Sequence, residues 1–464
     1  MGWKPPAAAL CSGLLYFFGT GFTPIPALTW LAPLPVLLLA PGVSARSAAA
    51  AAFLAGVLGS ANNWAHSLHS TDVPLPMALG ISAGTAVTLT AAVLLFRALL
   101  LRGQPLLAAV AAPAVWTGAL YLVALTNPTG VMGTPANSMG DLPVVLQIAS
   151  VTGFWGVEFV LLLVPAGIAA VAGSTVHRWR TGAAVAVVVI GVLGFGIVRL
   201  AGETGPSQRV ALIAPNQGHW AVEVGTAEGD RLIQAYAERI SALPQGVRLV
   251  VLPEGEFGVD DASLPSLVSP LTTAARDRGA DVVVGYVRRS GSARLNTALA
   301  IPANGGSPVA YVRDQARELV YAAGAGVQIC GEVNLARPSR DYAAAGARTL
   351  AIPAADEKVN GWQHARVASL RGVENGLGVA WSGRSGALMV SDGTGRIVAE
   401  AHTGGEGTFT TVVADLPAGP GATPYTRLGD WFAWLCLVIT VAGVCVSVLS
   451  SRWKGGRDDS AGVE

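Results

Sequence analysis

The sequence predicts a multi-pass α-helical membrane domain joined to one α/β domain, and three observations support this prediction. Charged residues make up 13% and apolar residues 52% of the 464 residues, whereas a soluble domain has roughly 25% charged residues. Long apolar runs fill residues 7–200. A charge-rich segment at 208–418 then alternates short apolar runs with amphipathic stretches, which is typical of an α/β domain with buried sheets.

Apolar runs close to the length of about 20 residues that crosses a hydrocarbon core predict eight transmembrane spans. They lie at residues 7–23, 27–41, 47–63, 75–96, 105–125, 155–173, 182–200 and 431–449. A signal peptide is the alternative for the first run, which follows Lys4, but the runs after it favour a first transmembrane helix. The predicted organisation is seven spans in 1–205, a soluble domain in 206–420, a last span in 428–450 and a tail in 451–464.

Basic residues are distributed unevenly over the connections between the predicted spans. The short connections 24–26, 64–74 and 126–154 contain no Lys or Arg, whereas the alternate connections and both ends of the chain do. Because cytoplasmic connections are enriched in Lys and Arg, we expect both termini in the cytoplasm and the 206–420 domain outside the plasma membrane. The formal net charge of +1 gives no reason to expect a nucleic-acid partner.

The soluble segment is predicted to alternate strands and helices. Strands are expected at 209–215, 249–252, 281–286, 296–301, 309–312, 327–330, 349–353, 379–381, 388–391 and 397–400, and helices at 226–242, 264–278, 338–346 and 362–374. In α/β folds the chemistry usually lies at strand ends, so the residues that follow these strands are the candidates for a site.

The cysteine distribution singles out Cys330. The other three cysteines, Cys11, Cys436 and Cys445, lie in predicted membrane runs, whereas Cys330 ends the 327–330 strand. A thiol presented there becomes a nucleophile when a neighbouring group takes its proton, although most free cysteines are small core residues. Cysteines this scattered form neither a disulfide framework nor a zinc pattern, so no metal site is expected.

Two carboxylates accompany this thiol. Glu254 follows the 249–252 strand, and Glu332 lies two residues after Cys330. A carboxylate beside a thiol can act as its general base and later return the proton to a leaving group, and Glu332 could orient either partner. Taken alone, each is an ordinary surface carboxylate. The sequence shows no phosphate-binding glycine loop and no Ser-His-Asp arrangement.

The chain resembles a known family at several points. The blocks around Glu254 and Cys330 resemble two catalytic blocks of the nitrilase (carbon–nitrogen hydrolase) superfamily. Further blocks resemble apolipoprotein N-acyltransferase: Gly153–Phe159, Gly361–Arg366, Leu370–Asn375, Ser391–Gly395 and Thr423–Trp431. The resemblance implies eight spans, with an external four-layer α-β-β-α sandwich before the last span.

The resemblance also implies a reaction. In that family a cysteine takes an acyl chain from a phospholipid as a thioester and passes it to the N-terminal amine of a lipoprotein. Glu254 would be the base, Cys330 the nucleophile and Glu332 a supporting carboxylate. The implied partners are a phospholipid donor, a lipoprotein acceptor and the membrane. No cofactor is implied, and we expect a monomer.

One departure from the family concerns a positive charge. The family has a Glu–Lys–Cys triad, but no lysine lies between Glu254 and Cys330. Because loss of one oxyanion donor costs about a hundred- to a thousandfold in rate, Arg313, Arg317 or Lys358 would have to replace it. Two alternatives therefore stay open: a weakly active or inactive homologue with a binding or assembly role, and a membrane-tethered amidase that uses water as the acceptor.

Overall fold

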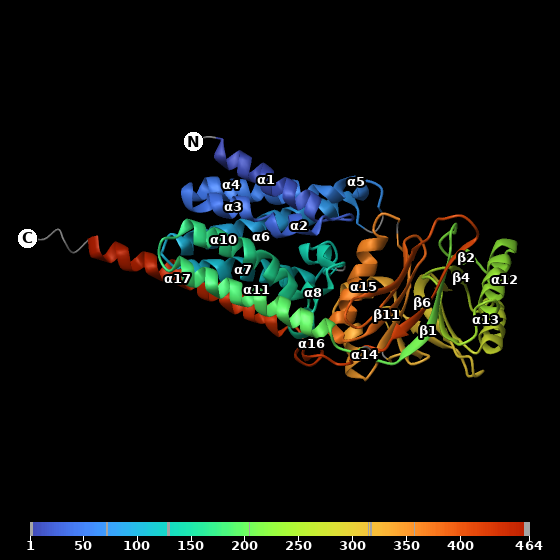
Figure 1. Ribbon diagram of the computed structural model, residues 1–464. Coiled ribbons are helices and arrows are strands. Elements are labelled where there is room, and N and C mark those ends of the chain that lie inside the picture. Colours follow the sequence, from blue (N-terminus) through green and yellow to red (C-terminus); the bar gives the residue numbers. More distant parts are fainter. Residues whose placement is uncertain are drawn as a thin grey trace, which may run out of the picture. The chain divides into compact units, whose positions relative to one another are not determined.

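The computed structural model describes residues 3–70, 73–127, 130–203, 205–313, 315, 318–356 and 358–458, with side chains up to residue 449 (Figure 1). The chain divides into two compact units. One consists of Met1–Ile197 with Gly429–Glu464, and the other of Val198–Leu428. We call them the membrane unit and the sandwich unit, and each is described by itself.

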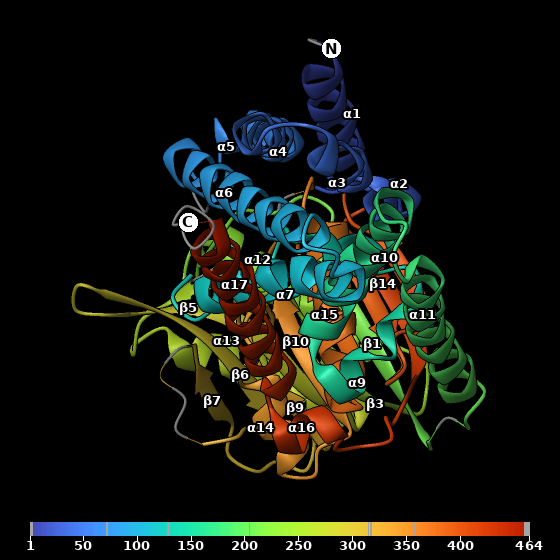
Figure 2. The ribbon, with the colours of Figure 1, turned by 90° about the vertical axis from the view of Figure 1, so that its left-hand side faces the viewer.

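Within the described residues, five helices are long and apolar enough to cross a membrane. They are α6 (Leu75–Leu100), α7 (Pro105–Ala124), α10 (Phe154–Gly173), α11 (Arg178–Leu200) and the Trp431–Leu449 part of α17 (Trp431–Asp458). Helix α7 packs against α6, α10 and α17 (Figure 2). The chain is thus a membrane protein, as the sequence predicts.

The first three predicted spans are shorter helices in the structure. They correspond to α1 (Lys4–Gly19), to the pair α2 (Pro26–Leu31) and α3 (Leu34–Leu39) with η1 (Ala40–Gly42), and to α4 (Ala45–Ser60). Proline lies in the first turn of both α2 and α3, and a proline there cannot continue a preceding helix without a break. The remaining short helices are η2 (Ala61–Asn63), α5 (Trp64–Ser67), η3 (Pro135–Met139), α8 (Pro143–Leu146) and α9 (Ala149–Thr152).

The sandwich unit contains two sheets. The first has the order β14-β1-β3-β5-β4-β2, with β6 paired to β5 and β7 to β6. Its strands are β1 (Ser207–Pro215), β2 (Val222–Glu223), β3 (Val247–Val251), β4 (Phe257–Val259), β5 (Asp281–Ser290), β6 (Ala293–Ile301), β7 (Val309–Val312) and β14 (Phe409–Pro417). The second has the order β13-β12-β11-β10-β9-β8. Its strands are β8 (Tyr321–Ala322), β9 (Ala325–Val327), β10 (Thr349–Ala354), β11 (Gly378–Gly383), β12 (Ala387–Ser391) and β13 (Ile397–His402).

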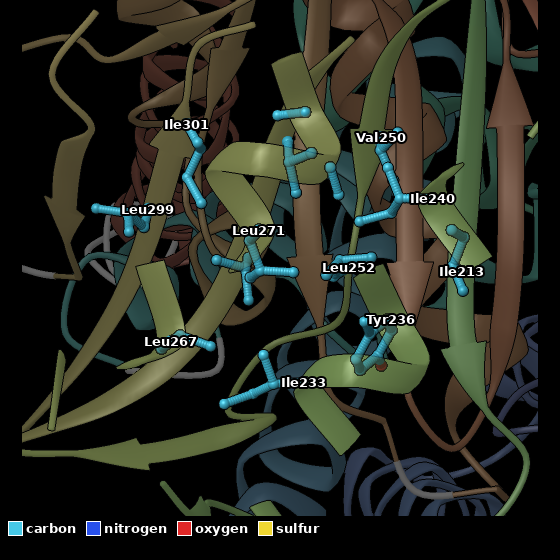
Figure 3. Packing of buried hydrophobic residues seen from close by; sticks show 14 of the residues in the cluster. Ile213, Ile233, Tyr236, Ile240, Val250, Leu252, Leu267, Leu271, Leu299 and Ile301 are labelled. Carbon is cyan, nitrogen blue, oxygen red and sulfur yellow. The ribbon is translucent and has the colours of Figure 1, made fainter. Parts of the chain in front are cut away.

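Helices cover the outer face of each sheet. On the first sheet α12 (Ala227–Ser241) and α13 (Leu264–Arg278) bury their apolar faces against β1, β3 and β6 (Figure 3). On the second sheet α15 (Gly361–Asn375) packs against β11 and β12, and α14 (Ser339–Ala344) lies beside it. Strands β1, β3 and β5 contact β10 and β11 across the middle. The unit is therefore an α-β-β-α sandwich, as the resemblance implied.

Helix α12 shows how the sequence directs one of these layers. Its N-cap Thr226 accepts a hydrogen bond from Gly229 N at 3.1 Å, which satisfies one of the amides that a helix start leaves without a partner. Ile233, Tyr236 and Ile240 recur at helical spacing and are buried. The predicted helix at 226–242 is confirmed.

Around Cys330 the structure differs from the expected strand. β8 and β9 form a hairpin that ends at Val327, and Cys330 begins the short 3-10 helix η4 (Cys330–Asn334). The sequence analysis also missed β14, which pairs antiparallel with β1 over its whole length. The β14 stretch at 409–417 contains polar residues and has Gly-rich flanks, so its period-2 pattern of apolar residues is weak.

Candidate active site

Glu332 fixes the turn that carries Cys330. Its Oε2 accepts a hydrogen bond from Ile329 N at 2.8 Å, and its Oε1 accepts one from the Tyr311 hydroxyl at 2.8 Å. The carboxylate thus ties the residue before the cysteine to β7. Cys330 itself is buried, with 3% of its surface exposed.

Glu254 lies after β3 and joins the two sheets. Its backbone N–H donates to Ala354 O at 3.1 Å, and its Oε2 accepts from Ala355 N at 3.2 Å. Asn296 on β6 donates its amide N–H to Oε1, and Arg313 Nη1 lies 3.8 Å from the same oxygen. The carboxyl group is buried and its orientation is fixed from both sheets.

Glu254 and Cys330 come together in the structure. Burial raises the pKa of the Glu254 carboxyl, while the Asn296 hydrogen bond, the Arg313 charge and a hydrogen bond with Cys330 oppose the shift. Burial, followed by the negative charges of Glu254 and Asp356, raises the pKa of the Cys330 thiol well above its ordinary value. The resting sulfur is therefore a thiol, and it needs a base to become a nucleophile.

Two residues that the sequence analysis did not select adjoin the sulfur. His364 Nδ1 lies 3.4 Å from Cys330 Sγ and 2.9 Å from Asp356 Oδ1. Asp356 Oδ1 lies 3.9 Å from Sγ, and Asp356 Oδ2 accepts from Trp381 Nε1 at 3.3 Å. Asp356 follows β10 much as Glu254 follows β3, and a carboxylate after a strand was the sequence signal that could have identified it. His364 lies in the first turn of α15.

The three side chains expected to replace the family's lysine differ in their positions. Arg313 lies close to the cysteine turn, because a Cβ atom at Gly331 would come within 2.6 Å of Arg313 Nη2. Lys358 is exposed on the loop after β10. Arg317 lies outside the described residues.

A second buried carboxyl lies near this region of the first sheet. Glu256 Oε2 accepts a hydrogen bond from the Tyr236 hydroxyl at 2.9 Å, and Arg384 Nε lies 3.8 Å from Oε1. Burial raises the pKa of Glu256 to about 7, against the charge of Arg384. This carboxyl therefore titrates near neutral pH.

Cys330 Sγ, Asp356 Oδ1 and His364 Nδ1 lie within 4.8 Å of one another, a spacing that a metal ion would also accept. Hydrogen bonds among the three groups account for the arrangement, and we assign no metal to it.

The fold and the site define a membrane protein with an α-β-β-α sandwich domain, in which a buried thiol lies among buried carboxyl groups. Residues 12–167 match the model of the apolipoprotein N-acyltransferase N-terminal domain. The N-terminal part of the chain is thus similar to this domain.

Individual proteins are similar over parts of the chain. The apolipoprotein N-acyltransferase of Thermotoga maritima is 31% identical over 149 residues, which are 30% of this chain and 27% of that protein. The match thus spans about a quarter of the relative. Among solved structures, an amidase from Nesterenkonia sp. is 23% identical with a TM-score of 0.38, covering 47% of this chain and 94% of the amidase. Saccharomyces cerevisiae Nit3, of the nitrilase superfamily, is 20% identical with a TM-score of 0.37, covering 46% and 93%.

Proposed function

We propose that the protein is a membrane acyltransferase that moves a phospholipid acyl chain through a thioester on Cys330 to the N-terminal amine of a lipoprotein. The observation that supports this most directly is the contact between the buried Cys330 thiol and the Glu254 carboxyl. It occurs in a chain whose N-terminal part is similar to the family domain. A thiol next to a base is the minimum that a thioester route requires.

In the first half-reaction Glu254 takes the thiol proton while the sulfur attacks the ester carbonyl carbon of the phospholipid. The C–S bond forms and the ester C–O bond breaks. The proton passes from Glu254 to the leaving oxygen, which releases a lysophospholipid. Burial of Glu254 suits this role, because a raised pKa makes the carboxylate a stronger base and moves its titration toward neutral pH.

In the second half-reaction the free amine attacks the thioester carbonyl. The C–N bond forms, the C–S bond breaks, and Glu254 carries one amine proton to the departing sulfur. Glu332 positions the turn through Ile329 N and Tyr311 without having to contact the substrate. Arg313 Nη1, 3.8 Å from Glu254 Oε1, supplies positive charge to the carboxyl side of the site.

The test is transfer between defined substrates. Purified full-length protein is incubated with a phospholipid that carries an alkyne-labelled acyl chain and with a diacylated lipopeptide whose N-terminus is free or acetylated. We expect labelled amide only on the free amine, and none with Cys330→Ala, while the matched variant Cys445→Ala keeps full activity. Labelled fatty acid without amide would instead favour the amidase alternative. No consumption of any donor would favour a binding or assembly role.

A further inference from the structure

We propose that His364, held in place by Asp356, is the positioning residue that donates a hydrogen bond to the Cys330 sulfur anion. In this arrangement Glu254 remains the separate base. The assignment rests on Cys330 being the nucleophile of the proposed function. Its test, however, measures the state of the thiol and not acyl transfer.

The geometry of a single imidazole nitrogen carries the inference. His364 Nδ1 faces both Asp356 Oδ1, at 2.9 Å, and Cys330 Sγ, at 3.4 Å. A nitrogen that close to a carboxylate carries a hydrogen, because a lone pair there would face another lone pair. This one N–H lies between the carboxylate and the sulfur and can be shared with a sulfur anion. The nitrogen then has no lone pair with which to take the thiol proton.

His364 and Glu254 thus have different roles at the sulfur. The imidazole donates to the sulfur, and the carboxyl accepts the proton from it. Different elements hold the two side chains. Glu254 is held by β6 and the β10 loop. His364 comes from α15 and packs edge-on to Trp381, with ring centroids 5.1 Å apart. Trp381 also holds the second oxygen of Asp356, so the orientation of the carboxylate is fixed.

The charges around the sulfur explain why such a donor is needed. Burial and two carboxyl groups, those of Glu254 and Asp356, oppose formation of a thiolate. Arg313 favours it, but this guanidinium is 37% exposed and lies beside Glu254. His364 is the basic side chain recorded within hydrogen-bond distance of Sγ among the described residues. An N–H at that position stabilises the sulfur anion through a hydrogen bond, and Asp356 keeps the imidazole in place.

The experiment follows thiolate formation directly in the full-length protein. The ultraviolet absorbance of the thiolate is titrated against pH, and the curve of the matching Cys330→Ser protein is subtracted, so that tyrosine ionisation and the other cysteines cancel. This readout does not depend on a reagent reaching a buried thiol. The variants are His364→Ala, which removes the donor, and His364→Asn, which keeps a donor near the position of Nδ1.

We expect the midpoint of thiolate formation to rise by about one pH unit or more in His364→Ala, because a hydrogen bond to the charged form of a group favours that form. His364→Asn should fall between His364→Ala and the unchanged protein. His402→Ala, which removes an exposed histidine of the same unit, should leave the midpoint unchanged. Should His364→Ala fail to fold, as judged by gel filtration and circular dichroism, His364→Asn still decides the question by its upward shift.

Equal midpoints in the unchanged protein and the folded His364 variants would overturn the proposal. A chelator that raises the midpoint in the unchanged protein would also overturn it, because a metal ion rather than the imidazole would then stabilise the sulfur anion. If the His364 shift is present but no lipopeptide is acylated, the inference stands and the proposed function fails.

Discussion

At the scale of single residues, the site depends on buried carboxyl groups that have different tasks. Glu254 meets the thiol, Asp356 orients His364, and Glu332 holds the cysteine turn. The sequence pointed to Glu254, Cys330 and Glu332, because the first two follow or end a predicted strand and the third is two residues from the cysteine. It could not reveal Asp356 and His364 as partners, since their meeting depends on how α15 packs on the second sheet.

Glu332→Gln tests the positioning role of Glu332. A glutamine amide has one oxygen and one NH₂ group, so it can accept from Ile329 N or from Tyr311 but must turn a donor toward the other. We expect a loss of about 1–3 kcal/mol in the free energy of unfolding, the usual cost of a buried donor left unsatisfied. The measurement is chemical denaturation of the purified protein. Glu238→Gln, on the exposed face of α12, is the control and should change little.

The raised pKa of the Glu256 carboxyl predicts that the stability of the protein depends on pH. Its pKa is about 7 in the folded protein against an ordinary value of 4.5, so the folded state binds this proton more tightly than the unfolded state does. Stability from this group is therefore greatest below pH 4.5 and declines as the pH rises toward 7. At 1.36 kcal/mol per pKa unit the decline is about 3 kcal/mol.

Glu256→Gln isolates this contribution. Denaturation curves of both proteins are recorded from pH 5 to pH 8, and the difference between their unfolding free energies is plotted against pH. We expect the unchanged protein to lose stability relative to the variant as the pH rises. A difference that stays flat, or that grows in favour of the unchanged protein, would show that the pKa of the Glu256 carboxyl is not raised in the folded protein.

At the scale of elements, β5 and the end of β3 approach so closely that only glycine fits at position 285. A Cβ atom there would collide with the backbone of Pro253 and lie 2.5 Å from Glu254 Cα. Gly285→Ala should therefore push Glu254 out of place, lowering acyl transfer at least tenfold and the free energy of unfolding by about 1–3 kcal/mol, as for overpacking in a core. Gly405→Ala, where a Cβ atom would meet open space, is the matched control for both assays.

The same scale explains which elements the sequence predicted. The strand at 281–286 and the helix at 226–242 were found because each carries a strong local pattern, a run of β-branched residues in one and helical apolar spacing in the other. The pairs β8–β9 and β2–β4 have strands of two or three residues. Strands this short contain too few residues to show a period-2 pattern, so the sequence does not reveal them.

At the scale of the whole molecule, the orientation in the membrane follows from the basic residues of the connections. We predict that the sandwich unit lies outside the cytoplasmic membrane. Alkaline phosphatase fused after Gly205 should be active, because this enzyme needs its disulfides and forms them outside the cytoplasm. The same enzyme fused after Arg102, in a predicted cytoplasmic connection, should be inactive. The reverse pattern would contradict the predicted orientation.

The central claim is that Cys330 carries the acyl chain. The most direct measurement is the intact mass of the full-length protein after incubation with a phospholipid and no acceptor, followed by peptide mapping. We predict one added acyl chain on Cys330 that hydroxylamine removes, that is absent from Cys330→Ala, and that disappears when an amine acceptor is added. Unmodified Cys330 after incubation with phospholipids of several headgroups and chain lengths, or an acyl chain found only on another residue, would contradict the account.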